Sequence, residues 1–140
     1  MFVFKKVTID LVIAGLLLTA CGGSKATDVK ITLNEFGIES SRTDFQKDVP
    51  YRFVVTNAGT VEHEMMIMAP TMTDSTGMVM DMGAMDKMAL VMIEASDLPA
   101  GATASFDYTF TESAAAGSLE LACHTPGHYE AGMKLPITVQ

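Results

Sequence analysis

The segment Thr103-Ala-Ser-Phe-Asp-Tyr-Thr-Phe110 places an apolar side chain at every second position. This alternation is typical of a β-strand, because successive side chains of a strand point to opposite faces of a sheet. The same period of two recurs in residues 28–34 and 52–57, and more briefly in 119–123 and 137–139. Gly and Pro residues punctuate the gaps between these segments. The pattern predicts an all-β, antiparallel β-sandwich.

The composition limits the class of protein. The 140 residues are 49% hydrophobic and 19% charged, which predicts a folded chain of one domain. The net charge of -8 argues against nucleic acid as a partner, because proteins that bind nucleic acids neutralise phosphates with clustered Lys and Arg. Two Cys are too few for a disulfide-stapled mini-protein or a four-thiolate zinc site.

Residues 1–20 are predicted to be a lipoprotein signal peptide. Two lysines precede the apolar run 11–18, and Leu18-Thr-Ala-Cys21 resembles the bacterial lipobox. This resemblance implies acylation of Cys21 and anchoring to a membrane on the extracytoplasmic face of the cell envelope. Residues 21–27 then form a flexible tether. Two alternatives are ordinary secretion of a soluble form and a disulfide between Cys21 and Cys123.

The segment Cys123-His-Thr-Pro-Gly-His128-Tyr-Glu-Ala-Gly-Met133 carries three potential metal ligands at intervals of five residues. A thiolate, an imidazole and a thioether suit a soft or borderline metal, and copper uses all three. A blue copper site combines one Cys and two His with a weakly bound Met. The second His has to come from another part of the chain, and His63 lies at the start of an apolar stretch.

Residues 28–140 resemble the cupredoxins, copper proteins with a Greek-key β-sandwich. Asn57-Ala-Gly-Thr-Val-Glu-His63-Glu and Pro126-Gly-His-Tyr-Glu-Ala-Gly-Met133 are most similar to the plastocyanin-like copper-binding proteins of the bacterial periplasm. The resemblance implies one type 1 copper site that cycles between Cu(I) and Cu(II). It also implies His63, Cys123 and His128 as equatorial ligands and Met133 as the axial ligand.

Each of these ligands has a simpler interpretation when it is taken singly. A Cys near the end of a strand is usually a small buried hydrophobic residue, and a Met can fill a core. Zinc is disfavoured, because a structural zinc site has little use for a thioether. We do not assign His124 as a ligand, since its side chain should point away from that of Cys123. Glu64 occupies a position where many cupredoxins carry a small residue that ties the two ligand loops together.

Residues 70–90 form a Met-rich insertion with a loop and at most one short helix. Its thioethers could form a second, weaker Cu(I) site, because thioethers bind Cu(I) without releasing a proton. The alternative is an apolar helix face that covers the sandwich and serves as a docking patch, and we favour it slightly. The residues of the candidate second site are Met78, Met80, Met82, Met85 and Met88.

The predicted function is that of a one-electron carrier of the cell envelope, with partner proteins docking at Pro126, His128 and Tyr129. The alternative is copper trafficking, storage or tolerance together with other copper-handling proteins, with the Met-rich segment binding Cu(I). An enzyme is disfavoured, because three His leave no ligands for further copper ions. We expect a monomer.

Overall fold

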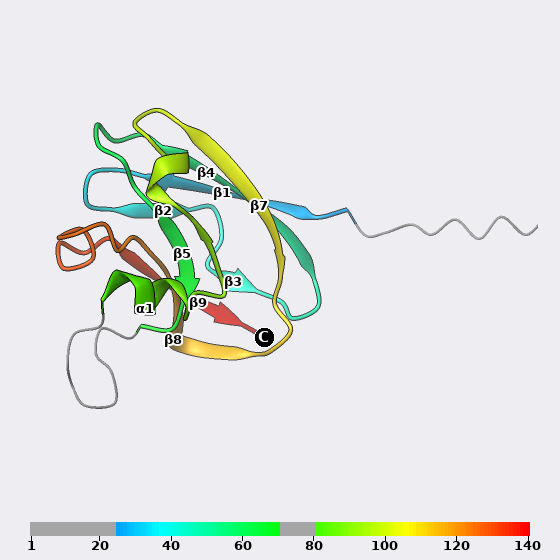
Figure 1. The fold of residues 1–140 in the computed structure, drawn as a ribbon. Helices are drawn as coiled ribbons and strands as arrows, with labels where there is room; N and C mark the ends of the chain where they lie inside the picture. Colours follow the sequence, from blue (N-terminus) through cyan, green and yellow to red (C-terminus); the bar gives the residue numbers. More distant parts are fainter. Residues whose placement is uncertain (1–24, 71–80) are drawn as a thin grey trace, which may run out of the picture.

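The computed structural model describes residues 25–70 and 81–140, which form two β-sheets packed face to face (Figure 1). The expected signal peptide, Cys21 and the first part of the Met-rich insertion lie outside the described residues. Among the described residues, no helix combines the length and the apolar character required to cross a membrane.

The first sheet has four strands and supplies one wall of the core. Its order is β2 (Ile38–Ser40), β1 (Thr27–Leu33), β4 (Pro50–Asn57) and β7 (Thr103–Thr109). β1 runs parallel to β4, with Val29 opposite Phe53, whereas the other neighbours are antiparallel. The alternation read from the sequence is confirmed in β1 and β4, whose inward side chains are buried. β7 is an edge strand, so its apolar side chains are only half-buried.

The second sheet has five strands, and its end carries the segment with the three spaced ligands. Its order is β3 (Asp44–Phe45), β9 (Lys134–Val139), β8 (Ala114–Ala122), β5 (Met65–Met68) and β6 (Val91–Ile93). β3 is parallel to β9, and the remaining pairs are antiparallel. The all-β sandwich is thus confirmed, with mixed sheets where the sequence predicted purely antiparallel ones. Hydrophobic alternation reports which face is buried and not the direction of the neighbouring strand.

The core between the sheets contains a cluster of aromatic rings packed among aliphatic side chains. Phe45 meets Tyr51 edge to face at 5.0 Å between ring centroids, and Phe53 stacks on Phe106 at 4.9 Å. Cys123 and Met133 belong to this same buried cluster. The ligands predicted from the sequence are therefore set in the main core of the sandwich, where packing holds side chains in place.

β5 is buried on both faces, which explains why it lacks a period of two. Met65 and Ile67 belong to the main core, whereas Met66 and Met68 form a second cluster with Met85. Met85 comes from the short helix α1 (Met82–Asp86), which lies beside β5 and β8 (Figure 1). Asp81 caps α1 by accepting a hydrogen bond from the Ala84 N–H at 3.0 Å. The short helix expected in the Met-rich insertion is present, and a 3-10 turn, η1 (Ala95–Asp97), follows β6.

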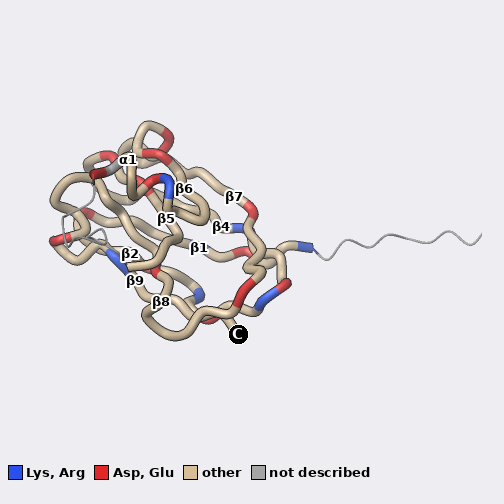
Figure 2. The backbone as a smooth tube through the Cα atoms, turned by 60° about the horizontal axis from the view of Figure 1, so that its bottom comes forward, with Lys and Arg blue, Asp and Glu red and all other residues tan. Residues whose placement is uncertain are grey.

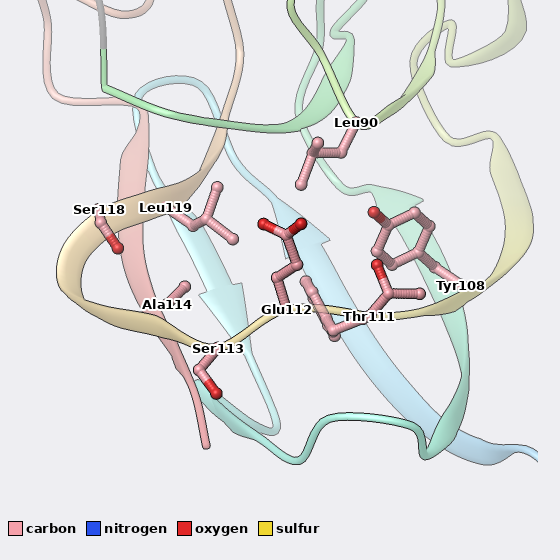
Figure 3. Close-up of a pocket in the computed structure, with 9 residues that line it drawn as sticks. Leu90, Tyr108, Thr111, Glu112, Ser113, Ala114, Ser118 and Leu119 are labelled. Carbon is pink, nitrogen blue, oxygen red and sulfur yellow. The ribbon is translucent and has the colours of Figure 1, made fainter.

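A surface pocket of about 410 Å³ lies where β7 ends and β8 begins. Its lining includes Leu90, Tyr108, Phe110, Glu112 and Leu119. The Glu112 carboxylate rises between Leu119 and Tyr108 toward Leu90 (Figure 3). None of the predicted metal ligands lines this pocket. Acidic positions outnumber basic ones along the loops and strand ends (Figure 2).

Candidate metal centre

Three of the four predicted ligands meet at one end of the sandwich. His63 lies in the loop between β4 and β5, Cys123 directly follows β8, and His128 lies in the loop between β8 and β9. The Nδ1 atoms of the two imidazoles are 3.1 Å apart. The Cys123 Sγ lies 3.9 Å from the Nδ1 of His63 and 3.6 Å from that of His128. Two loops that are distant in the chain thus aim three donor atoms at one point.

This triangle has the size that a single metal ion requires. An ion with ~2.0 Å bonds to nitrogen and ~2.3 Å bonds to sulfur in a trigonal plane holds the donors roughly 3.5–3.7 Å apart. The observed edges of 3.1, 3.6 and 3.9 Å bracket that range. One thiolate and two imidazoles are the equatorial donors of a blue copper site, so the residues fit one copper ion.

Burial keeps the His63 imidazole neutral and the Cys123 thiol protonated until a metal ion binds. His63 and Cys123 are fully buried, and His128 is half-buried. Burial lowers the pKa of His63, and the neighbouring His128 lowers it further, so His63 is held neutral with a free ring nitrogen. Burial raises the pKa of the Cys123 thiol, which therefore keeps its proton until a cation displaces it. Cys123 is a free thiol in the structure.

Asn57 shapes the loop that carries His63. It is fully buried, and its side-chain amide donates to the carbonyls of Val61 at 2.7 Å and Leu98 at 2.8 Å. Its Oδ1 accepts from the Gly59 N–H at 2.9 Å. The Leu98 carbonyl also accepts from the His63 N–H at 3.2 Å. One buried amide thus fixes both ends of the loop and sets the position of the His63 backbone.

Gly59 packs against the far edge of the His63 ring. A Cβ at this position would lie 2.9 Å from His63 Nε2 and 3.3 Å from Asn57 Oδ1. His63 Nε2 is buried and has no hydrogen-bond partner among the described residues. The absence of a side chain at Gly59 therefore leaves room for an imidazole whose Nδ1 faces the other donors.

A chain of tight turns positions the remaining ligands in the loop between β8 and β9. The His128 carbonyl accepts from the Met133 N–H at 3.0 Å, and the Met133 carbonyl accepts from the Cys123 N–H at 3.1 Å. Gly127 and Gly132 have φ values of 86° and 108°, which favour glycine. These turns fold the loop back on itself, so that Met133 is fully buried beside the backbone of Cys123. Met133 is thus placed in the same part of the core as the three donors.

Glu64 connects the two ligand loops, as its position in the sequence predicted. Its Oε1 accepts from the His124 N–H at 2.7 Å, and the carboxylate is only 6% exposed. Burial raises the pKa of Glu64, and the hydrogen bond from His124 lowers it in part. This bond joins the residue after His63 to the residue after Cys123, and it fixes the spacing between two of the three donors.

The surface beside His128 differs from the docking patch predicted from the sequence. His128 is half-buried and Pro126 is exposed, whereas Tyr129 is only 6% exposed. The Tyr129 hydroxyl donates to Glu120 Oε1 at 2.6 Å, which explains its burial. Phe36, which the sequence did not point to, is 61% exposed and meets the His128 ring edge to face at 6.1 Å. No motif singled it out, because it comes from the distant β1–β2 turn.

Of the Met-rich insertion, the structure describes residue 70 and residues 81–90. Met85 is 5% exposed against Met66 and Met68, as expected for the apolar face of a helix. Met88 is 45% exposed. Met78 and Met80 lie outside the described residues, and nothing is described of the Met82 side chain.

A curated protein with a similar sequence is a copper-resistance protein. The copper-resistant cuproprotein CopI of Rubrivivax gelatinosus is 37% identical over 89 residues, which are 64% of this chain and 51% of that protein. The match thus spans about half the length of the relative. No family model matches the chain.

Solved structures with the same architecture include two auracyanins. The dithionite-reduced auracyanin of Roseiflexus castenholzii matches 84% of this chain and 99% of its own, with a TM-score of 0.57 and 17% identity. Auracyanin B matches 84% of this chain and 91% of its own, with a TM-score of 0.59 and 18% identity. These likenesses confirm the cupredoxin fold that the sequence predicted.

Proposed function

We propose that this chain holds one type 1 copper ion and carries single electrons. His63, Cys123 and His128 would be the equatorial ligands and Met133 the axial one. The observation that carries the proposal is the triangle of two Nδ1 atoms and one Sγ, with edges of 3.1–3.9 Å. Bound copper would supply the couple between Cu(I) and Cu(II).

The protein would contribute a donor set that needs little movement when the charge of the ion changes. The Asn57 amide holds the His63 loop, and the Glu64 carboxylate ties this loop to the one after Cys123. The turn hydrogen bonds of the β8–β9 loop hold Met133 beside Cys123. Donors fixed in this way are preorganised, so little free energy is spent on rearrangement during electron transfer.

Electrons would enter and leave through the His128 edge. His128 is the half-buried member of the triangle, whereas His63 and Cys123 are fully buried. Exposed Phe36 and Pro126 flank it and offer an apolar contact for a redox partner protein. We propose that the protein acts as a monomer, anchored through acylated Cys21 outside the cytoplasm, with no enzymatic activity of its own.

A second candidate function is copper tolerance, with the chain binding copper for delivery or storage. The observation that favours it is the 37% identity with the copper-resistant cuproprotein CopI. The two functions differ in what the protein does with its copper. A carrier retains one ion through many redox cycles, whereas a tolerance protein takes up copper in excess or passes it on.

The experiment is a Cu(II) titration of the purified protein, followed by visible absorption and electron paramagnetic resonance. We expect an intense thiolate-to-copper band that saturates at one equivalent. Cys123→Ser should abolish the band completely while the far-ultraviolet circular dichroism stays that of a β protein. Met66→Leu, on the opposite face of the sheet, is the matched control and should keep the band. A band that persists in Cys123→Ser would overturn the ligand assignment.

Repeated reduction and oxidation in the presence of a Cu(I) chelator separates the two candidate functions. A carrier should retain nearly all of its copper through this challenge. Loss of copper to the chelator at each reduction, together with copper resistance conferred on a sensitive bacterial host, would favour the tolerance function.

A further inference from the structure

The outer face of the second sheet holds a buried imidazole that the type 1 site does not use. His124 is 4% exposed, and its Nε2 has no hydrogen-bond partner among the described residues. Its ring stacks on Tyr129, with centroids 4.4 Å apart and planes at 15°. The Tyr129 hydroxyl is itself anchored on Glu120. An unpaired buried nitrogen costs about 1–3 kcal/mol, so a ring held this firmly without a partner points to a missing ligand.

Thioethers share this face with His124. Met66 pairs with Ala122 across the β5–β8 ladder, so His124, two residues further on, lies diagonally across from Met66. Diagonal neighbours are roughly 7–8 Å apart, within reach of long side chains. Beyond the end of β8, the bond from the His124 N–H to the Glu64 side chain keeps these two residues side by side. Met66 is fully buried and packs in one cluster with Met85, which α1 lays over the sheet.

α1 also carries a buried carboxylate oxygen that lacks a hydrogen-bond partner among the described residues. Asp86 follows Met85 in α1, and its Oδ1 is buried with no hydrogen-bond partner among the described residues. Asp86 therefore adds a second buried polar atom without a partner, in the residue next to Met85, whose side chain packs against Met66.

We propose that this layer is a second metal site, for Cu(I), with His124 Nε2 and the thioethers of Met66 and Met85 as ligands. Thioethers select Cu(I) among the biological metals, and a neutral imidazole suits it as well. Asp86 balances the charge of the ion without being required as a ligand. The site goes beyond the proposed electron carrier and does not depend on it, because none of its ligands belongs to the type 1 set. Cys123 and His124 are adjacent, so one peptide unit would connect the two metals.

The test uses the whole purified protein and Ag(I), a redox-silent analogue of Cu(I), followed by ¹⁵N NMR of the three imidazoles. We expect the His124 resonances to shift with one equivalent of Ag(I), separately from those of His63 and His128. A competition titration with a chromophoric Cu(I) chelator then gives the affinities. His124→Gln should weaken one Cu(I) equivalent by roughly 100-fold, since losing a ligand costs at least as much as losing a residue that supports one.

Further variants distinguish a metal site on the outer face from Cu(I) bound elsewhere in the chain. Met66→Leu and Met85→Leu should each weaken the same Cu(I) equivalent, whereas Met88→Leu, which removes an exposed thioether, should not. All four variants should keep the blue Cu(II) band. NMR shifts confined to His63 and His128 would overturn the second site. So would a second Cu(I) equivalent that still binds to His124→Gln but is lost when Met78→Leu and Met80→Leu are combined. If the wild-type protein showed no blue band with Cu(II), that result would instead refute the proposed carrier and leave the second site unaffected.

Discussion

The two faces of the β5–β8 pair carry similar side chains in different settings. His63, Met65 and Cys123 point into the sandwich, and their neighbours Glu64, Met66 and His124 point outward. On the inner face, three donor atoms converge within 3.1–3.9 Å. On the outer face, the His124 Nε2 and the Asp86 Oδ1 are buried without partners among the described residues. Successive side chains of a strand point to opposite faces, so the residues around β5 and the end of β8 form two chemically distinct layers.

The layers also differ in what covers them. The inner layer is enclosed between two sheets and fixed by the hydrogen bonds of Asn57 and of the β8–β9 loop. The outer layer is covered by α1, a helix of five residues. A helix this short is marginal by itself and depends on the contacts of Met85. The comparison indicates a rigid inner site and a more adaptable outer one, and the following variants test that difference.

The largest effect on copper affinity is expected for Gly59→Ala, which places a Cβ against the ring of His63 in the inner layer. Its Cβ would lie 2.9 Å from His63 Nε2, so the imidazole has to move away. We expect the affinity for copper to fall about 10–100-fold, as for other changes behind a metal ligand. The measurement is competition against a chelator, together with the intensity of the visible band.

Gly37→Ala is the matched control, because a Cβ there meets nothing within 4 Å. It should leave both copper affinity and colour unchanged. Equal copper affinities for the two variants would contradict a rigid inner layer, since they would show that His63 can relax at no cost.

Tyr129→Phe is expected to lower folding stability and to leave copper affinity unchanged, because it alters the outer layer and keeps the ring that stacks on His124. The variant removes the 2.6 Å hydrogen bond to Glu120, a carboxylate that is 4% exposed. Hydrogen bonds to charged groups contribute about 1.5–3 kcal/mol, and we expect a loss of this size in urea unfolding. Tyr108→Phe is the control, since that hydroxyl has no hydrogen bond within the described ranges. A weakened blue band in Tyr129→Phe would show that the layers are coupled.

Much of the inner layer could be predicted from the sequence, and little of the outer one. The ligand types at intervals of five residues identify Cys123, His128 and Met133, because a single loop carries all three. His124 was set aside because its side chain points away from that of Cys123, which is correct for the inner site. What lies opposite His124 depends on the register of β5 against β8 and on where α1 packs. These are tertiary facts with no signature in the spacing of residues. The same holds for Phe36, which reaches His128 from another sheet.

The smallest effect is expected for Glu64→Gln, which keeps the connection between the layers and removes its charge. The amide carbonyl can still accept the hydrogen bond from the His124 N–H. Burial raises the pKa of Glu64 in the folded protein, so the folded state binds the proton more tightly than the unfolded state. The stabilisation from this carboxyl is therefore fully present below its unfolded pKa and is lost as the pH rises through the folded pKa. The Gln variant cannot lose it, so metal-free Glu64→Gln should gain stability relative to wild type as the pH rises above the ordinary pKa of Glu, about 4.3. Urea unfolding across this range is the measurement, and Glu62→Gln, at an exposed position, should run parallel to wild type. If the stability of Glu64→Gln changed with pH in parallel with that of wild type, burying the Glu64 charge would have no measurable cost.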